Sequence, residues 1–323
     1  MYFDQSAKIY VAGHRGLVGS AICRDLEKQG YQNIITKTHQ ELDLEDQNKT
    51  EEFICDSKPD VVFLAAAKVG GIQANNSFPV DFLMSNLAIQ SNVIKAAYQA
   101  KVKRLFFLGS SCIYPKYCPQ PIKEKYLLTS ELEPTNRPYA LAKIAGIEMC
   151  WSYNRQYSTQ FLAVMPTNLY GPNDNYDPNT SHVLPALIRK VHEAKVNQES
   201  VITLWGSGEP LREFLYADDL ACALILMMNL DERKFYNLVY QDICPVINIG
   251  SGEEVRIKDL AYKIMEEIQY KGHLINDKSK PDGTFQKLLE SNVIKSLGWV
   301  PKIDLASGIK LTYRDFLLRK GKS

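Results

Sequence analysis

The chain has 323 residues, about two typical domain lengths, and 45% of them are hydrophobic and 23% charged, which excludes an intrinsically disordered protein. Its 38 lysines and arginines nearly balance 37 aspartates and glutamates, and the net charge of +1 excludes the broad basic surface that binds nucleic acid or an acidic membrane. No apolar run approaches the roughly 18 residues of a membrane span, and the N-terminal residues do not have the pattern of a secretory signal. The seven cysteines lack paired spacing. We therefore expect a soluble, reduced, cytoplasmic protein.

The first half of the chain alternates short apolar runs with longer amphipathic stretches. The runs are rich in Val, Ile, Leu and Phe, as strands buried on both faces are, and they predict strands at 8–12, 34–37, 61–66, 104–108 and 161–165. Helices are expected between these strands, at 17–28, 47–57, 80–100 and 138–157. This alternation implies right-handed crossovers, so we predict an α/β fold with a doubly wound parallel sheet over residues 1–171.

From Pro172 onward the sequence becomes polar and more interrupted. Short strands are expected at 201–205 and 246–249, and helices at 183–195, 217–229, 257–268 and 305–318. These pieces are too interrupted for a second doubly wound unit. Residues 172–323 therefore predict mainly a smaller α/β C-terminal lobe for substrate binding, with part of 214–250 packing back onto the first domain.

A glycine motif, Gly13-His14-Arg15-Gly16-Leu17-Val18-Gly19, joins the first expected strand to the first expected helix. Its glycines allow a tight turn, the close approach of a pyrophosphate, and close packing of the helix on the sheet. The helix N-terminus offers unpaired N–H groups to the phosphates. An ordinary turn is the alternative, but the position between a strand and a helix favours a Rossmann-type dinucleotide site.

The end of the second expected strand indicates which dinucleotide is bound. An acidic residue there would hold the ribose hydroxyls of NAD, yet the sequence reads Thr36-Lys37-Thr38-His39. Arg15 with Lys37 or His39 would form a positive pocket for a 2′-phosphate, so we expect NADPH/NADP+. The alternative is that Lys37 and His39 are ordinary solvated side chains. Asp43 is a further candidate contact, to the adenine edge.

Tyr139 and Lys143 are four residues apart and therefore lie on one face of an expected helix. A lysine in this place can hold a cofactor ribose and lower the pKa of the phenol. The spacing alone occurs by chance in many helices, but Ser110 follows the fourth expected strand, at the edge where open α/β sheets bind ligands. Ser110 and Tyr139 can then hydrogen-bond one carbonyl oxygen while a hydride reaches its carbon.

With Ser110, Tyr139 and Lys143 in this order, the sequence resembles the extended short-chain dehydrogenase/reductase family. Further segments narrow the resemblance to the GDP-L-fucose synthase group of that family: AAAKVGGI at 65–72, GSSCIYP at 109–115, EPTN at 133–136, PTNLYGP at 166–172 and WGSG at 205–208. Matching segments run from residue 8 to beyond Trp299, nearly the whole chain.

The resemblance implies a bifunctional enzyme that epimerises C3 and C5 of GDP-4-keto-6-deoxy-D-mannose and then reduces C4 with NADPH to give GDP-L-fucose. Epimerisation needs a base to remove each proton and an acid to return one from the opposite face, and Cys112 and His182 match these roles in the family. A lone cysteine is most often a small buried side chain, and a lone histidine is often solvated. The motifs SSC at 110–112 and NTSH at 179–182, together with the resemblance, instead favour catalytic roles for both side chains. Tyr139 would be the acid for reduction, assisted by Ser110 and tuned by Lys143.

The same resemblance implies which residues bind the ligands. Besides the glycine motif, Lys37, His39 and Asp43, the expected cofactor contacts are Leu108, Gly109, Ser110, Ser111, Lys143, Pro166, Thr167, Asn168, Leu169 and His182. The expected GDP-sugar contacts are Lys190, Trp205, Arg212 and Asp282. Alternatively, Trp205 covers core and Asp282 forms a turn. Lys190 and His39 stand where relatives often have arginine, which leaves open the strength of the NADP preference.

Two alternatives keep the fold: an enzyme for a GDP-4-keto-3,6-dideoxy sugar, of the colitose type, and a nucleotide-sugar 4-epimerase that retains NAD. The 4-epimerase would not need Cys112 or His182. A non-catalytic NADP(H) sensor is the alternative from another class, but a sensor needs no proton donor such as Tyr139. The five histidines are too dispersed for a metal site. We expect a GDP-sugar substrate, no nucleic-acid or membrane partner, and a homodimer joined by the helices at 80–100 and 138–157.

Overall fold

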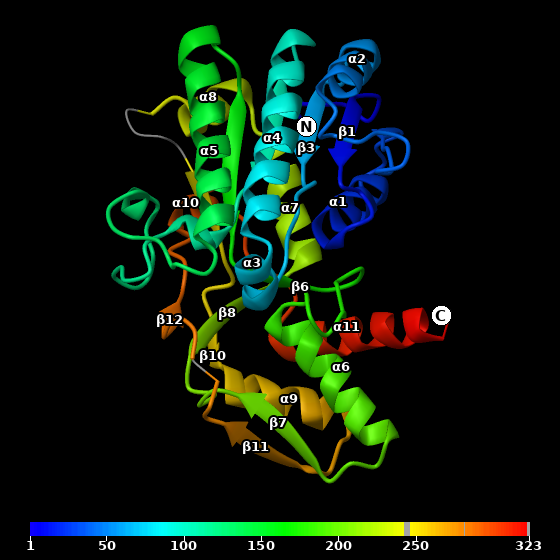
Figure 1. The fold of residues 1–323 in the computed structure, drawn as a ribbon. Helices are drawn as coiled ribbons and strands as arrows, with labels where there is room; N and C mark the ends of the chain where they lie inside the picture. The colour runs from blue at the N-terminus through cyan, green and yellow to red at the C-terminus, as the bar shows by residue number, and fades with distance from the viewer. Residues whose placement is uncertain (242–245, 281, 322–323) are drawn as a thin grey trace.

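The computed structural model describes residues 1–241, 246–280 and 282–321. Figure 1 shows a larger part built on a central sheet and, below it, a smaller part formed mainly by the later residues. The central sheet has six parallel strands in the order β2-β1-β3-β4-β5-β9. Their bounds are β1 Lys8–Ala12, β2 Asn33–Ile35, β3 Val61–Leu64, β4 Arg104–Leu108, β5 Phe161–Pro166 and β9 Val246–Ile249.

Helices cover both faces of this sheet. One face carries α1 (Leu17–Lys28), α7 (Ala217–Met228) and α8 (Glu232–Val239), and the other carries α2 (Gln47–Ser57), α4 (Pro79–Gln99) and α5 (Arg137–Tyr157). Side chains alternate along the strands, so Val61 and Phe63 enter one apolar core whereas Val62 and Leu64 enter the other. The predicted fold class, a doubly wound Rossmann-type sheet, is therefore confirmed.

The strand order locates the ligand-binding edge of the sheet. The chain runs from β1 to its neighbour β2 and then crosses back over β1 to pair β3 on the other side. Such a reversal leaves a crevice beyond the carboxyl ends of β1 and β3, because the connections on the two sides diverge there.

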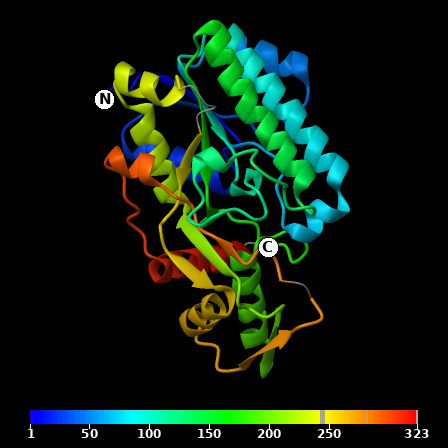
Figure 2. The same cartoon turned by 90° about the vertical axis from the view of Figure 1, so that its left-hand side faces the viewer.

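The smaller part is centred on β8 (Leu211–Tyr216), which pairs with three short strands. These are β6 Asn168–Tyr170, β10 Glu254–Arg256 and β12 Gln286–Lys287. A separate pair, β7 (Val201–Trp205) and β11 (His273–Asp277), lies at the far end. The helices are α6 Val183–Val196, α9 Ile257–Ile268 and α11 Leu305–Lys320, which share one apolar core. In both Figure 1 and Figure 2, α11 lies where the two parts meet.

Most of the predicted elements are present, and the differences concern ends and short pieces. The strand expected at 61–66 stops at Leu64, and the one expected at 34–37 is Asn33–Ile35. The sequence analysis missed α3 (Ile72–Ser77), α8, α10 (Asn292–Ser296) and the strands β6, β8, β10, β11 and β12. Apart from α8, which has eight residues, these pieces have two to six residues and are too short to show a hydrophobic period. None of the described helices combines the length and the apolar character that crossing a bilayer requires.

Arg104, the first residue of β4, is fully buried. Its guanidinium carbon lies 4.1 Å from the ring centre of Tyr2 and 4.0 Å from that of Phe235. Its Nη1 donates to the carbonyl oxygens of Met228 (2.7 Å) and Leu230 (2.8 Å). These contacts tie the N-terminal segment, the sheet and the turn between α7 and α8 together.

We therefore predict that Arg104→Met lowers the free energy of unfolding by about 2–4 kcal/mol, because two carbonyl oxygens lose their donor and two aromatic rings lose a cation. Urea unfolding followed by circular dichroism measures the loss. Lys103→Met is the matched control, since Lys103 forms an exposed pair with Asp60, and such a pair contributes at most about 1 kcal/mol. An equal loss in the two variants would contradict the prediction.

Candidate active site

A cleft of about 610 Å³ lies at the carboxyl ends of the central strands. The predicted cofactor and catalytic residues that line it are Gly13, Gly16, Leu17, Val18, Gly19, Lys37, His39, Asp43, Leu108, Gly109, Ser110, Ser111, Tyr139, Lys143, Pro166, Thr167, Asn168, Leu169 and His182. His14, Arg15 and Cys112 lie outside this lining. The sequence analysis did not assign several other lining residues, including the segment 65–70 and residues 173–175. The segment 65–70 follows β3, so the strand-end rule could have found it.

The turn after β1 has the geometry of a phosphate cradle. Gly13 has a φ of +83°, and a Cβ at this position would lie 2.7 Å from the amide nitrogen of Ala66. A Cβ at Gly19 would lie 2.2 Å from the carbonyl oxygen of Gly13, so only glycine lets α1 pack this close to the turn. No side chain caps the N-terminus of α1, which leaves its first N–H groups for an anion. The turn therefore fits the pyrophosphate of a dinucleotide.

Of the three basic side chains expected to select NADP, two line the cleft and one does not. Lys37 and His39 line it, but each lies 3.7 Å from a carboxylate, of Glu41 and Asp43 respectively. Arg15 is exposed and does not line the cleft. The exposed pair of Lys37 with Glu41 contributes little, so a 2′-phosphate can compete with the Glu41 carboxylate for Lys37.

Ser110, Tyr139 and Lys143 meet at the carboxyl end of β4. Lys143 Nζ donates to the carbonyl oxygen of Leu108 at 2.8 Å and lies 5.8 Å from the ring centre of Tyr139. Ser110 precedes a short 3-10 helix (Ser111–Ile113), and its Oγ accepts from the amide of Cys112 at 3.4 Å. The helix α5 thus presents Tyr139 and Lys143 to the strand end that carries Ser110, an arrangement that can polarise a carbonyl group and protonate its oxygen.

Burial has the largest effect on the pKa values of Lys143 and Tyr139. It lowers the pKa of Lys143 to about 8 and raises the pKa of Tyr139 above its usual value, with the nearby Cys112 raising the latter further. The sequence analysis expected Lys143 to lower the pKa of the Tyr139 phenol. The structure differs because burial penalises the charged form of each of the two side chains.

Cys112 lies beside the main cleft, in a small cavity that it shares with Glu133 and Lys287. Burial raises the pKa of its thiol, whereas the positive charges of Lys287 and Lys143 lower it. Lys287 was missed by the sequence analysis because it lies in β12, a strand of two residues without a periodic signal. Its partner in register is Arg212 of β8, one of the expected substrate contacts.

His182 approaches the cleft from the smaller part of the molecule. It is the residue before α6, and burial lowers the pKa of its imidazole. A neutral imidazole has both a donor and an acceptor nitrogen, so it can return a proton to a carbon or accept one. Cys112 and His182 thus add two titratable side chains, the first beside the cleft and the second in its lining.

The four expected substrate residues gather around β7 and β8, outside the main cleft. Lys190 Nζ donates to the carbonyl oxygen of Thr203 at 2.8 Å and lies 6.0 Å from the ring centre of Trp205, which is 57% exposed. Asp282 accepts from the amide (2.8 Å) and Oγ (2.7 Å) of Ser207. Burial lowers the pKa of Arg212, opposed by the charge of Asp282. The cluster offers an exposed aromatic ring beside positive charges.

The sequence profile of the NAD dependent epimerase/dehydratase family matches residues 9–240. The chain belongs to this family. The chain is 55% identical to "Putative GDP-L-fucose synthase 2" of Arabidopsis thaliana, over 97% of its own length and 93% of that protein. It is 49% identical to "GDP-L-fucose synthase" of Escherichia coli K12, over 96% of both chains. The resemblance to GDP-L-fucose synthases is thus confirmed.

Two further comparisons bear on cofactor and substrate. A "gdp-l-fucose synthetase from Naegleria fowleri bound to NADP" is 28% identical, with a TM-score of 0.88 over 100% of this family member and 96% of that chain. "GDP-L-colitose synthase" of Yersinia pseudotuberculosis is 38% identical, over 97% of this family member and 99% of that protein.

Proposed function

We propose that this family member converts GDP-4-keto-6-deoxy-D-mannose to GDP-L-fucose by epimerising C3 and C5 and then reducing C4, with NADPH as its cofactor. The observation that carries the proposal is the position of Cys112: its amide donates to Ser110 Oγ at 3.4 Å, and the positive charge of Lys143 acts on its thiol. A simple ketoreductase needs no thiol there. The relatives at 55% and 49% identity carry the name of this activity, which supports the proposal.

The roles of the residues follow from their chemistry. NADPH, when bound, supplies the hydride that reduces C4. At each of C3 and C5, Cys112 removes the proton next to the C4 ketone and His182 returns a proton from the opposite face. Ser110 and Tyr139 donate hydrogen bonds to the C4 oxygen, which stabilises the enolate during epimerisation, and Tyr139 protonates this oxygen during reduction. Lys143 holds the ribose of the cofactor.

We also propose that two parts of the chain bind different ligands. Residues 1–171 bind NADP, and part of 214–250 packs onto this domain, supported by the position of β9 in the central sheet and of α7 against it. Residues 242–245 lie outside the described residues. Residues 172–323 mainly bind the GDP-sugar, supported by the cluster of Lys190, Trp205, Arg212 and Asp282. A cytoplasmic location is supported by the thiols of Cys23, Cys55, Cys112, Cys118 and Cys222, which are not joined in disulfides.

The test is incubation with GDP-4-keto-6-deoxy-D-mannose and NADPH in heavy water, following cofactor absorbance and product mass together. We expect loss of NADPH with solvent deuterium entering the sugar. Loss of NADPH without deuterium would leave a 4-ketoreductase and remove the roles of Cys112 and His182. The absence of turnover would overturn the proposal.

A 3,6-dideoxy substrate of the colitose type is the second candidate, because a colitose synthase is 38% identical over nearly the full length. The two substrates differ at C3, where the 6-deoxy sugar carries a hydroxyl group. Competition between equal amounts of the two GDP-4-keto sugars discriminates the candidates through the ratio of their kcat/KM values. A higher value for the 3,6-dideoxy sugar would select the second candidate.

A homodimer joined through α4 and α5 is part of this proposal. The two helices lie side by side on the outside of the molecule in Figures 1 and 2, with Val80 (67% exposed), Met84 (57%) and Leu141 (42%) on their surfaces. We expect light scattering after gel filtration to give twice the mass of the chain, and Met84→Glu to give a monomer. Leu318→Glu, an exposed apolar site on α11, is the control and should remain dimeric. A monomeric wild type would contradict the expectation.

A further inference from the structure

The carboxyl group of Asp174 has no role in the function proposed above. Asp174 is 5% exposed and lines the main cleft. Its Oδ1 accepts from the amide of Asn175 at 2.7 Å, whereas its Oδ2 is buried and has no hydrogen-bond partner. A buried carboxylate oxygen without a donor is costly, so this oxygen requires either a proton or a ligand.

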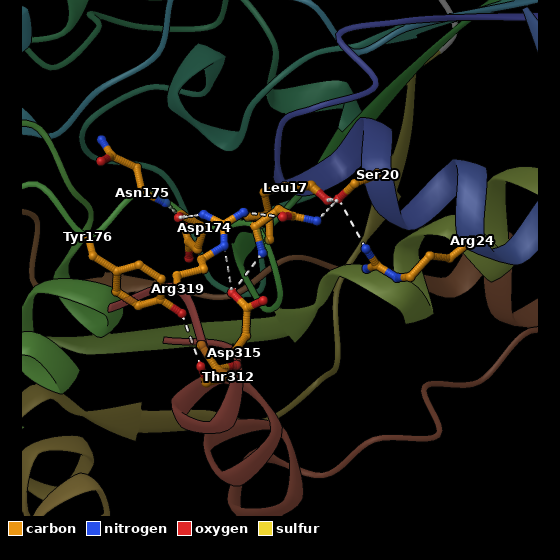
Figure 3. Close-up of polar contacts among 10 residues, drawn as sticks. Leu17, Ser20, Arg24, Asp174, Asn175, Tyr176, Thr312, Asp315 and Arg319 are labelled. Atoms are coloured by element: carbon orange, nitrogen blue, oxygen red, sulfur yellow. Dashed lines mark hydrogen bonds and ion pairs between the residues drawn. The ribbon is translucent and has the colours of Figure 1, made fainter. Parts of the chain in front are cut away.

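The loop that carries Asp174 is fixed from two sides, as Figure 3 shows. Asp315 of α11 accepts from the amide of Asn173 at 3.0 Å, and Arg319 of the same helix contacts the side chain of Asn173. On the other side, Asn173 Nδ2 donates to Ser20 Oγ of α1 at 2.9 Å. The loop is therefore held between α1 and α11, and these contacts oppose the movement that would carry the Asp174 carboxyl group into bulk water.

This loop borders the end of the cleft that suits an anion. A Cβ at Gly171, three residues before Asp174, would lie 3.6 Å from Leu17 Cδ1, at the first residue of α1. Leu17 and Val18 line the same cleft as Asp174, and no side chain caps their helix. Phosphates bind at such a helix N-terminus because its N–H groups and dipole are positive. An ionised carboxylate beside them would repel a phosphate, whereas a protonated carboxyl group would donate to it.

The charged groups around Asp174 leave it able to carry that proton. The pKa of Asp174 is raised to about 7, mainly by burial and also by Asp315, although the hydrogen bond from the Asn175 amide and the charge of Arg319 lower it. The phenol of the neighbouring Tyr176 is neutral near pH 7, because burial raises its pKa. Arg24 of α1 is paired with Asp218 rather than with this carboxyl group.

We propose that protonated Asp174 donates a hydrogen bond to the phosphate region of the dinucleotide, so that cofactor binding takes up a proton at this residue. The proposal rests on NADPH as the cofactor of the proposed function. Above the pKa of Asp174, each binding event must first restore the proton. Affinity then falls as the pH rises, by at most about tenfold per pH unit for one proton.

The test measures the Kd of NADPH by fluorescence titration between pH 6.5 and 8.5 for the wild type and for Asp174→Asn, whose amide always donates. Over this range we expect the wild-type Kd to rise at least about fivefold more than that of Asp174→Asn. The control is Asp177→Asn, which removes a carboxylate from the same loop outside the cleft lining. It should retain the wild-type pH dependence. The other ionisable groups that line the cleft, such as Lys143 and His182, are the same in all three proteins and cancel in the comparison.

Calorimetry at pH 8 in buffers of different ionisation enthalpy counts the protons directly. We expect the wild type to take up more protons on binding NADPH than Asp174→Asn does. Equal uptake and equal pH dependence would overturn the proposal, whereas a wild type that does not bind NADPH would instead refute the cofactor assignment. If Asp174→Asn does not fold, the infrared difference spectrum of the wild type with NADP+ at pH 8 decides. A band of a protonated carboxyl group must appear on binding, and its absence overturns the proposal.

Discussion

Replacing Tyr139 by phenylalanine should lower kcat for C4 reduction by about 10³-fold, within the range of 10²–10⁴ that a positioned general acid contributes. The substitution removes one hydroxyl group and leaves the ring in place, packed edge-on against Phe82 with 6.2 Å between the ring centres. The ring also keeps its position 5.8 Å from Lys143 Nζ. The Kd of NADPH should therefore change by less than about threefold, because the cradle after β1 and the Lys143 ammonium are intact.

Single-turnover oxidation of NADPH measures the effect of Tyr139→Phe separately from product release. Tyr157→Phe is the matched control: it lies at the last residue of the same helix, is 45% exposed, and should react like the wild type. Deuterium exchange into the sugar should persist in Tyr139→Phe at a reduced rate, because Ser110 still donates to the C4 oxygen. Reduction by Tyr139→Phe at the wild-type rate would show that another group protonates this oxygen.

The sequence predicted the sheet and the phosphate cradle because both depend on local patterns. The runs at 8–12 and 104–108 are apolar throughout most of their length, and both strands have these bounds in the structure. The glycines at 13 and 19 could be interpreted because a strand before them and a helix after them fix where the backbone must turn. In each case the signal and the structure that it specifies lie within about 20 residues of one another.

The parts that the sequence did not reveal depend on contacts between distant segments. Lys287 reaches the Cys112 cavity only because β12 pairs with β8, which places it opposite Arg212. The Asp174 carboxyl group is buried in a loop that α11, about 140 residues later in the chain, fixes through Asp315. The direction of the Tyr139 pKa shift also depends on burial, which spacing along one helix cannot show.

Replacing Cys112 by serine should lower the rate of deuterium entry into the sugar by about 10²-fold or more, while the Kd of NADPH stays unchanged. A hydroxyl group is a far weaker acid than a thiol, so a serine side chain at this position could not hold the negative charge that Lys287 and Lys143 stabilise at the Cys112 sulfur. Reduction should slow together with exchange, because the hydride step follows epimerisation of the same sugar.

The control for Cys112→Ser is Cys118→Ser. Cys118 is also a free cysteine whose pKa is raised by burial and lowered by Lys287, but it lines neither the main cleft nor the Cys112 cavity. It should therefore exchange deuterium at the wild-type rate. Rapid exchange in Cys112→Ser would assign the base to another group, and His182, the other proton-exchanging group at the cleft, would then have to act on both faces. A 4-keto sugar already epimerised at C3 and C5 separates the steps, because Cys112→Ser should reduce it at the wild-type rate if the thiol acts only in epimerisation.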